Sequence, residues 1–169
     1  MPSEWPELPY EMWSATCDTL HAHAQLLGKL AVALAPPEPQ LQHAALRLSA
    51  RGWETLPLPA PDGSGALVVA LDLHSHQTVV EHTDGRMQRV PLAPARPVGA
   101  VTREVLAAVA DLVGPVQVNL RPQETPWTTP LDEDEDGLSD LEDAVVRRLT
   151  FSRLERLIPS FSFAGRRRF

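Results

Sequence analysis

Hydrophobic residues recur at alternating spacings of four and three along residues 10–35, which is the period of an amphipathic helix. Prolines bound the segment at Pro9 and Pro36, and proline is rarely tolerated inside a helix. At about 100° per residue, Met12, Leu26 and Leu30 lie outside the main apolar stripe, where they flank the polar sector of the helix on its far side. That stripe, which we expect to face the core, consists of Trp13, Cys17, Leu20, Ala24, Leu27, Ala31 and Leu34.

A polar sector of the same helix is formed by Asp18, His21, Gln25 and Lys29. These residues fall within roughly 80° of the helix circumference. One interpretation is that they form the solvent-facing edge of a half-buried helix, which needs no special cause. The other is that they line a pocket. The first interpretation is favoured.

A period of two replaces the helical period after residue 44 and predicts β-strands. The turn signal Asp84-Gly85 predicts a hairpin. Residues 74–77, although they contain two histidines, are expected to join two strands rather than to bind a metal. The expected strands are residues 44–49, 53–58, 66–73, 78–82 and 87–92.

A second helix is expected to begin after Pro97 and to end at Gly114, where glycine and proline are typical stop signals. Residues 116–120 alternate between apolar and polar side chains, which predicts a half-buried strand. Ser139 and Glu142 form a capping box for a last helix that reaches about residue 158.

These elements predict an α+β fold in which a long N-terminal helix packs on a mostly antiparallel sheet of four to six strands, with a second and a C-terminal helix. The chain of 169 residues is long enough for one core. We expect a single domain over residues 1–130. Residues 131–169 are expected to be an acidic linker, the C-terminal helix and a disordered tail.

Composition narrows the classes of function. A formal net charge of −7 argues against nucleic-acid binding. No apolar run approaches the ~20 residues that span a bilayer, and no signal peptide is evident. The single cysteine excludes an internal disulfide and fits a reducing compartment, so a cytoplasmic location is expected. Nothing in the sequence requires a cofactor.

Several short motifs occur in the order seen in one family of uncharacterised bacterial proteins. They are Trp5-Pro6-Glu7-Leu8-Pro9, Thr19-Leu20-His21 followed by Gln25 and Gly28-Lys29, and Ala50-Arg51-Gly52. The chain thus resembles a domain-of-unknown-function family with no established activity. The resemblance implies no catalytic residues.

The chain departs from that family at two places. Members usually carry an Asn-His-Trp-Trp-His cluster where this chain has residues 39–43, so only His43 remains of it. Members also continue beyond a Phe-x-Gly-basic element similar to the one that begins at Phe163, so the resemblance implies a truncated C-terminus.

Two sets of candidate site residues follow. A ligand pocket would be built from His21, Gln25, Lys29, His43 and Arg51. A metal site would use the acidic run, where aspartates and Gly137 occupy the positions of a calcium loop. Its candidate ligands are Asp132, Asp134, Asp136, Asp140 and Asp143. An aspartate stands at position 12 instead of the usual bidentate glutamate, and a solvated charge run explains most of the pattern.

Three functional hypotheses result. The leading one is a small cytoplasmic binding or interaction protein without catalysis. The second is an enzyme with a polar pocket around the helix segment from His21 to Lys29. The third is a weak calcium-binding module. The sequence leaves open whether the protein is an enzyme, and it names no ligand or partner.

Overall fold

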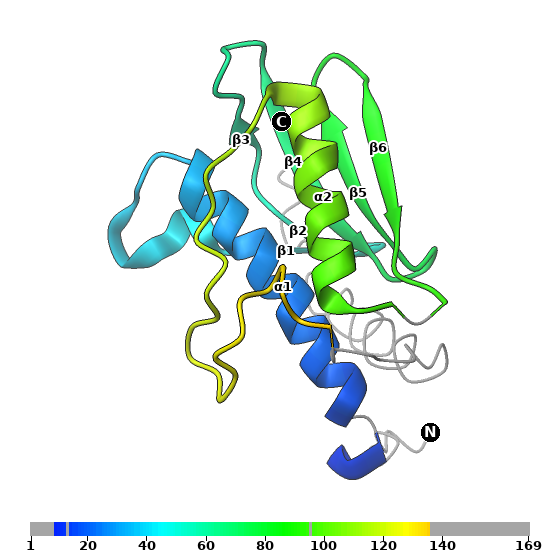
Figure 1. Cartoon of the computed structure of the whole chain (residues 1–169). Helices are drawn as coiled ribbons and strands as arrows, with labels where there is room; N and C mark the ends of the chain where they lie inside the picture. Colours follow the sequence, from blue (N-terminus) through cyan, green and yellow to red (C-terminus); the bar gives the residue numbers. More distant parts are fainter. Residues whose placement is uncertain (1–8, 13, 95, 136–169) are drawn as a thin grey trace, which may run out of the picture.

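The computed structural model describes residues 9–12, 14–94 and 96–135 and shows two helices packed on an antiparallel sheet (Figure 1). The α+β class is therefore confirmed. Trp13 and the predicted C-terminal helix lie outside the described residues. In chain order, the helical elements are η1 (Tyr10–Met12), α1 (Ser14–Leu34), η2 (Pro39–Ala44) and α2 (Val98–Val113).

All pairings in the sheet are antiparallel, and the strand order is β1-β2-β4-β5-β6, with β3 paired to β4. Short connections between consecutive strands produce this order, because antiparallel neighbours can be joined by tight turns. The strands are β1 (Arg47–Ser49), β2 (Gly52–Glu54), β3 (Leu58–Pro59), β4 (Ala66–Asp72), β5 (Gln77–His82) and β6 (Met87–Pro91).

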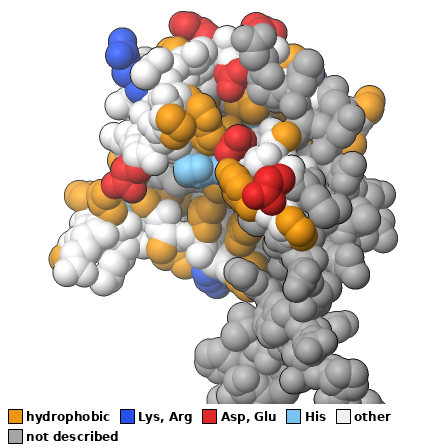
Figure 2. Space-filling model, turned by 90° about the horizontal axis from the view of Figure 1, so that it is seen from below, with side chains coloured by type: hydrophobic (Ala, Val, Ile, Leu, Met, Phe, Trp, Pro, Cys, Tyr) orange, Lys and Arg blue, Asp and Glu red, His pale blue; other side chains and the backbone are white. Residues whose placement is uncertain are grey.

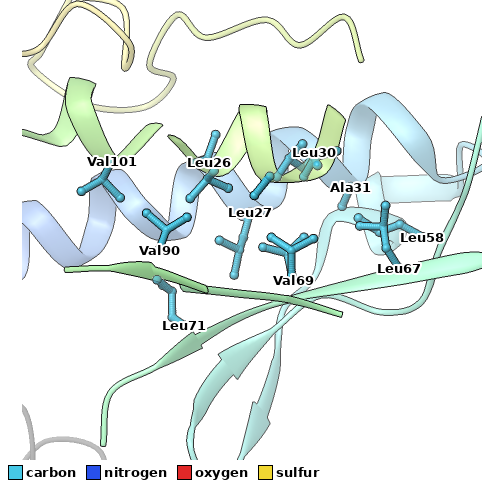
Figure 3. Packing of buried hydrophobic residues seen from close by; sticks show 14 of the residues in the cluster. Leu26, Leu27, Leu30, Ala31, Leu58, Leu67, Val69, Leu71, Val90 and Val101 are labelled. Carbon is cyan, nitrogen blue, oxygen red and sulfur yellow. The ribbon is translucent and has the colours of Figure 1, made fainter. Parts of the chain in front are cut away.

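The core lies between the helices and one face of the sheet. Leu67, Val69 and Leu71 alternate along β4 and belong to the buried cluster that also contains residues of both helices. Figure 3 shows Leu27 of α1 extending toward Val69 on this face of β4. The alternation predicted for this strand therefore places its apolar side chains on the face of the sheet that the helices cover.

Two tight turns have clear local causes. The Asp72 carboxylate accepts hydrogen bonds from the backbone N–H groups of His74 and Ser75, both at 3.0 Å, which fixes the β4–β5 hairpin. Gly52 has φ +147°, and a Cβ there would lie 2.2 Å from the carbonyl oxygen of Leu71. Only glycine fits where β2 meets β4.

The buried side of α1 is wider than the predicted stripe, because Leu20, Leu27 and Ala31 of the stripe are buried as predicted and further residues are buried beside them. Leu26 and Leu30 are 1% and 0% exposed, and His23 is also buried. Cys17 and Ala24, which belong to the predicted stripe, are only half-buried. The reason is that α1 contacts the sheet, α2 and η2, so a wide arc of its surface is covered rather than a narrow stripe.

Residues 115–130 leave α2 and run across α1 (Figure 1), and we call them the crossing segment. Val116, Val118 and Leu120 are half-buried against the core, as the alternation predicted. However, residues 116–120 pair with no strand, so the predicted strand is wrong as a sheet element. Leu131 follows, is buried and donates its N–H to the Leu120 carbonyl at 3.0 Å.

The backbone of residues 116–119 makes no hydrogen bond with any other group of the described chain. Backbone N–H and C=O groups in folded proteins are nearly always paired with protein or water. This stretch therefore presents unpaired hydrogen-bonding groups.

Candidate functional site

The polar sector of α1 binds the crossing segment. The Gln25 side-chain amide donates to the Gln123 carbonyl at 2.9 Å and accepts from the Gln123 N–H at 3.2 Å. A side-chain amide that makes both bonds to one residue reproduces the exchange of bonds in an antiparallel strand pair. Gln25 therefore anchors the backbone of an extended chain without reading its sequence.

Two further contacts extend this anchor. Lys29 donates from Nζ to the Arg121 carbonyl, and partial burial lowers the pKa of Lys29. The His21 ring meets the Trp127 ring edge-on, with 5.2 Å between their centroids. Gln25 and Lys29 are half-buried under the crossing segment, whereas Asp18 and His21 of the same sector are exposed.

The His21 ring contacts Trp127 and lies 3.4 Å from Gln25 Nε2, so His21→Ala is expected to lower the free energy of unfolding by about 1 kcal/mol. Chemical denaturation would measure this loss. The double variant His21→Ala/Trp127→Ala should cost less than the sum of the two single changes, because the pair shares one contact. A loss of about 3 kcal/mol or more from His21→Ala alone would contradict the exposed position of this ring.

The other two pocket candidates have partners elsewhere. His43 is buried in η2, where its Nδ1 accepts the N–H of Glu38 at 3.0 Å and so fastens the turn after α1. Arg51 forms a two-pronged ion pair with Glu81 at 3.0 and 3.2 Å and lies 3.8 Å from Glu54.

The Arg51 pair lies on the side of the sheet away from the helices, because Glu54 is opposite Ala70 and Glu81 is opposite Val68, which alternate with the core residues of β4. The hydrogen bonds from Arg51 lower the pKa of the Glu81 carboxyl against the opposing effect of burial. Among the described residues, neither Arg51 nor His43 forms a hydrogen bond or an ion pair with the polar sector of α1. The five-residue pocket stays a prediction.

The start of the acidic run packs on α2. Gly99 donates its N–H to the Asp134 carbonyl at 2.9 Å, and a Cβ at Gly99 would lie 2.8 Å from the Asp132 carbonyl oxygen. Arg103 binds the Asp132 carbonyl and the Glu135 carboxylate. The described part of the run is therefore held by a helix N-terminus and an arginine, both of which favour negative charge.

The remaining calcium candidates Asp136, Asp140 and Asp143 lie outside the described residues. Within the described ranges, no group of three or more His, Cys, Asp or Glu side chains is placed to hold a metal ion. Arg103 also puts a positive charge beside Asp132, the first candidate ligand, and this charge opposes a cation.

We expect calcium to bind the acidic run weakly, with a dissociation constant of roughly 10⁻⁴ to 10⁻³ M. An aspartate at position 12 is one methylene shorter than the usual bidentate glutamate, so it contributes fewer oxygens. Calorimetry on the protein and on Asp136→Ala would measure the difference. Micromolar binding that Asp136→Ala abolishes would contradict this expectation, whereas equal weak heats agree with a charge run.

One constellation was not found from the sequence. The His82 ring is fully buried, with Nδ1 2.9 Å from Asp84 Oδ1 and Nε2 3.2 Å from Ser64 Oγ. Serine, histidine and aspartate in this order are the parts of a nucleophilic triad. Yet Ser64 Oγ donates to Asp62 Oδ1 at 2.6 Å, so a carboxylate takes the proton that a triad would pass to histidine.

The same contacts have a structural role. They fasten the loop between β3 and β4 to the hairpin between β5 and β6, both at one end of the sheet. The N–H of Arg86, followed by His82, holds the pKa of the Asp84 carboxyl well below its usual range. The sequence signal that lies in this group is the Asp84-Gly85 turn, and no spacing rule relates that turn to the loop that contains Ser64.

Cys17 is half-buried on α1, and burial raises the pKa of its thiol. Asp18 acts in the same direction by charge repulsion. A raised pKa leaves little thiolate at neutral pH, so this cysteine is a poor nucleophile.

Seen from below, the described surface carries hydrophobic and acidic side chains around one histidine, with basic side chains at the edge (Figure 2). An anionic ligand would meet like charge on this face. Separately, among the residues that the structure describes, no helix has the length and apolar character needed to cross a membrane.

The fold and its contacts define an α+β domain in which an extended segment is held across the long helix by polar side chains. The chain belongs to a family of unknown function, DUF5996, whose family model matches residues 5–163. The resemblance found in the sequence motifs is thereby confirmed. No curated protein and no solved structure matches the chain.

Proposed function

We propose that this protein acts by binding another polypeptide and not by catalysis. The observation that carries the proposal is that each of the five pocket candidates already has a partner in its own chain. His21 contacts Trp127, while Gln25 and Lys29 bind the backbone of the crossing segment. His43 binds a turn and Arg51 binds Glu81. An enzyme needs polar groups that are directed at a substrate.

The unpaired backbone of residues 116–119 is a second, independent observation that supports the proposal. A row of free N–H and C=O groups is the feature that proteins use when they bind a partner by adding a strand. The cytoplasmic location belongs to the proposal and rests on the single cysteine, Cys17, which suits a reducing compartment.

The alternative is an enzyme whose site includes the polar sector of α1, and turnover would separate the two. The purified protein would be incubated with a cell extract, and small molecules would be compared before and after by mass spectrometry. The control variant Lys29→Met keeps the aliphatic stem of the side chain and removes its charge. We expect to find no compound that the wild type consumes and the variant leaves unchanged. A compound with that behaviour would establish the enzyme.

Cross-linking tests the binding itself. A photoreactive side chain at Gln117, which is exposed beside the unpaired backbone, is expected to form a discrete adduct with a polypeptide. The matched control is the same side chain at Gln42, which is exposed on η2. Adducts at neither position, or equally at both, would contradict the proposal.

A further inference from the structure

Residues 116–120, of which 116–119 have unpaired backbone groups, have the composition of an unprotected strand edge. The residues of this stretch are Val116, Gln117, Val118, Asn119 and Leu120, and none is charged. Edge strands in proteins usually carry charges, prolines or bulges that prevent pairing with another chain. Prolines occur here only outside the stretch, at Pro115 and Pro122.

The side chains of this stretch divide into two sets. Val116, Val118 and Leu120 are half-buried against the core, whereas Gln117 and Asn119 are exposed. The backbone groups of residues 116–119 are free at the same time. A second strand laid beside this one would gain backbone hydrogen bonds without displacing any bond of the folded chain.

The stretch is also complementary to itself. In an antiparallel pair of two copies centred on Val118, Gln117 would lie opposite Asn119 of the second copy, and Val116 opposite Leu120 of the second copy. The same register places Arg121 opposite Pro115, so no two like charges face each other. Opposed amide side chains can bond to each other, and apolar pairs pack on the same face.

We propose that two copies of this protein associate by antiparallel pairing of residues 116–120. This inference rests on the proposed binding function and names its partner as a second copy of the chain. Stable interfaces bury roughly 1,200–2,000 Å², and one short strand pair buries much less. The dimer is therefore weak and forms at high protein concentration.

Sedimentation equilibrium over a range of protein concentrations tests the association. The double variants Gln117→Lys/Asn119→Lys and Gln117→Glu/Asn119→Glu each place like charges opposite each other twice. Each is expected to weaken self-association about tenfold. Mixing the two variants pairs lysine with glutamate and is expected to restore association as a heterodimer. The control Gln42→Lys/Ala107→Lys has the same charge change at exposed positions and should behave as wild type.

Amide exchange locates the interface. The Leu120 carbonyl is bonded to Leu131, so a second strand would pair with the opposite edge, to which the backbone groups of Gln117 and Asn119 point. The amides of Gln117 and Asn119 should gain protection as the wild-type concentration rises, and those of the lysine variant should not. A wild type that stays monomeric at every concentration overturns the inference, as does a dimer that the lysine variant leaves intact. These two outcomes would leave the proposed binding function intact, because a cross-link from Gln117 to a different polypeptide would still support it.

Discussion

Leu30→Ala is expected to lower the free energy of unfolding by about 2–5 kcal/mol. Leu30 is 0% exposed and belongs to the buried cluster shown in Figure 3, so truncation removes buried apolar contacts and leaves a cavity. The matched variant is Leu34→Ala on the same helix, since Leu34 belongs to the predicted stripe but is only half-buried. We expect its loss to be about half as large or less.

Chemical denaturation of both variants measures these losses directly. The sequence pattern alone predicts the opposite order, because it places Leu34 on the core-facing stripe and Leu30 outside it. Equal losses, or a larger loss for Leu34→Ala, would show that the buried arc of α1 does not extend to Leu30. The comparison of the two stability losses therefore tests whether Leu30 or Leu34 is the more deeply buried residue.

Acidification is expected to destabilise the protein through His23. This side chain is 3% exposed on α1, and burial lowers its pKa to about 4 from an ordinary value near 6.5. Between these two values the unfolded chain binds a proton that the folded chain does not bind. Stability is therefore fully present above pH 6.5 and falls as the pH drops toward 4, by about 3 kcal/mol in all.

The variant His23→Leu removes this titration while keeping an apolar side chain in the buried position. Its free energy of unfolding should change less with pH between 4 and 6.5 than that of the wild type. His21→Ala serves as the control, because His21 is exposed two residues away on the same helix. A pH dependence that His23→Leu leaves unchanged would assign the acid sensitivity to other groups.

Local patterns in the sequence predicted the type and approximate extent of most elements. The helical period between Pro9 and Pro36 corresponds to α1, and the alternation of period two corresponds to β4, β5 and β6. The Asp84-Gly85 hairpin also occurs where it was expected. These successes share a cause, since backbone dihedrals and side-chain period are decided by residues near each other in the chain.

The candidate site was predicted less well. The sequence predicted the polar sector of α1, but the only interpretations it allowed were that the sector faces solvent or that it lines a pocket. The actual neighbours, Arg121 and Gln123, are 92 and 98 residues away in the chain. Likewise, the link between Ser64 and His82 joins two turns that no spacing rule relates.

The sequence by itself therefore determined which segments of this protein are helical or extended and where tight turns interrupt them. Only the tertiary structure decided which arc of α1 is buried, because that arc depends on how many elements cover the helix. It also decided that residues 116–120 cross α1 without joining the sheet. An extended segment pairs only where a free strand edge lies within reach, and its own period carries no information about that edge.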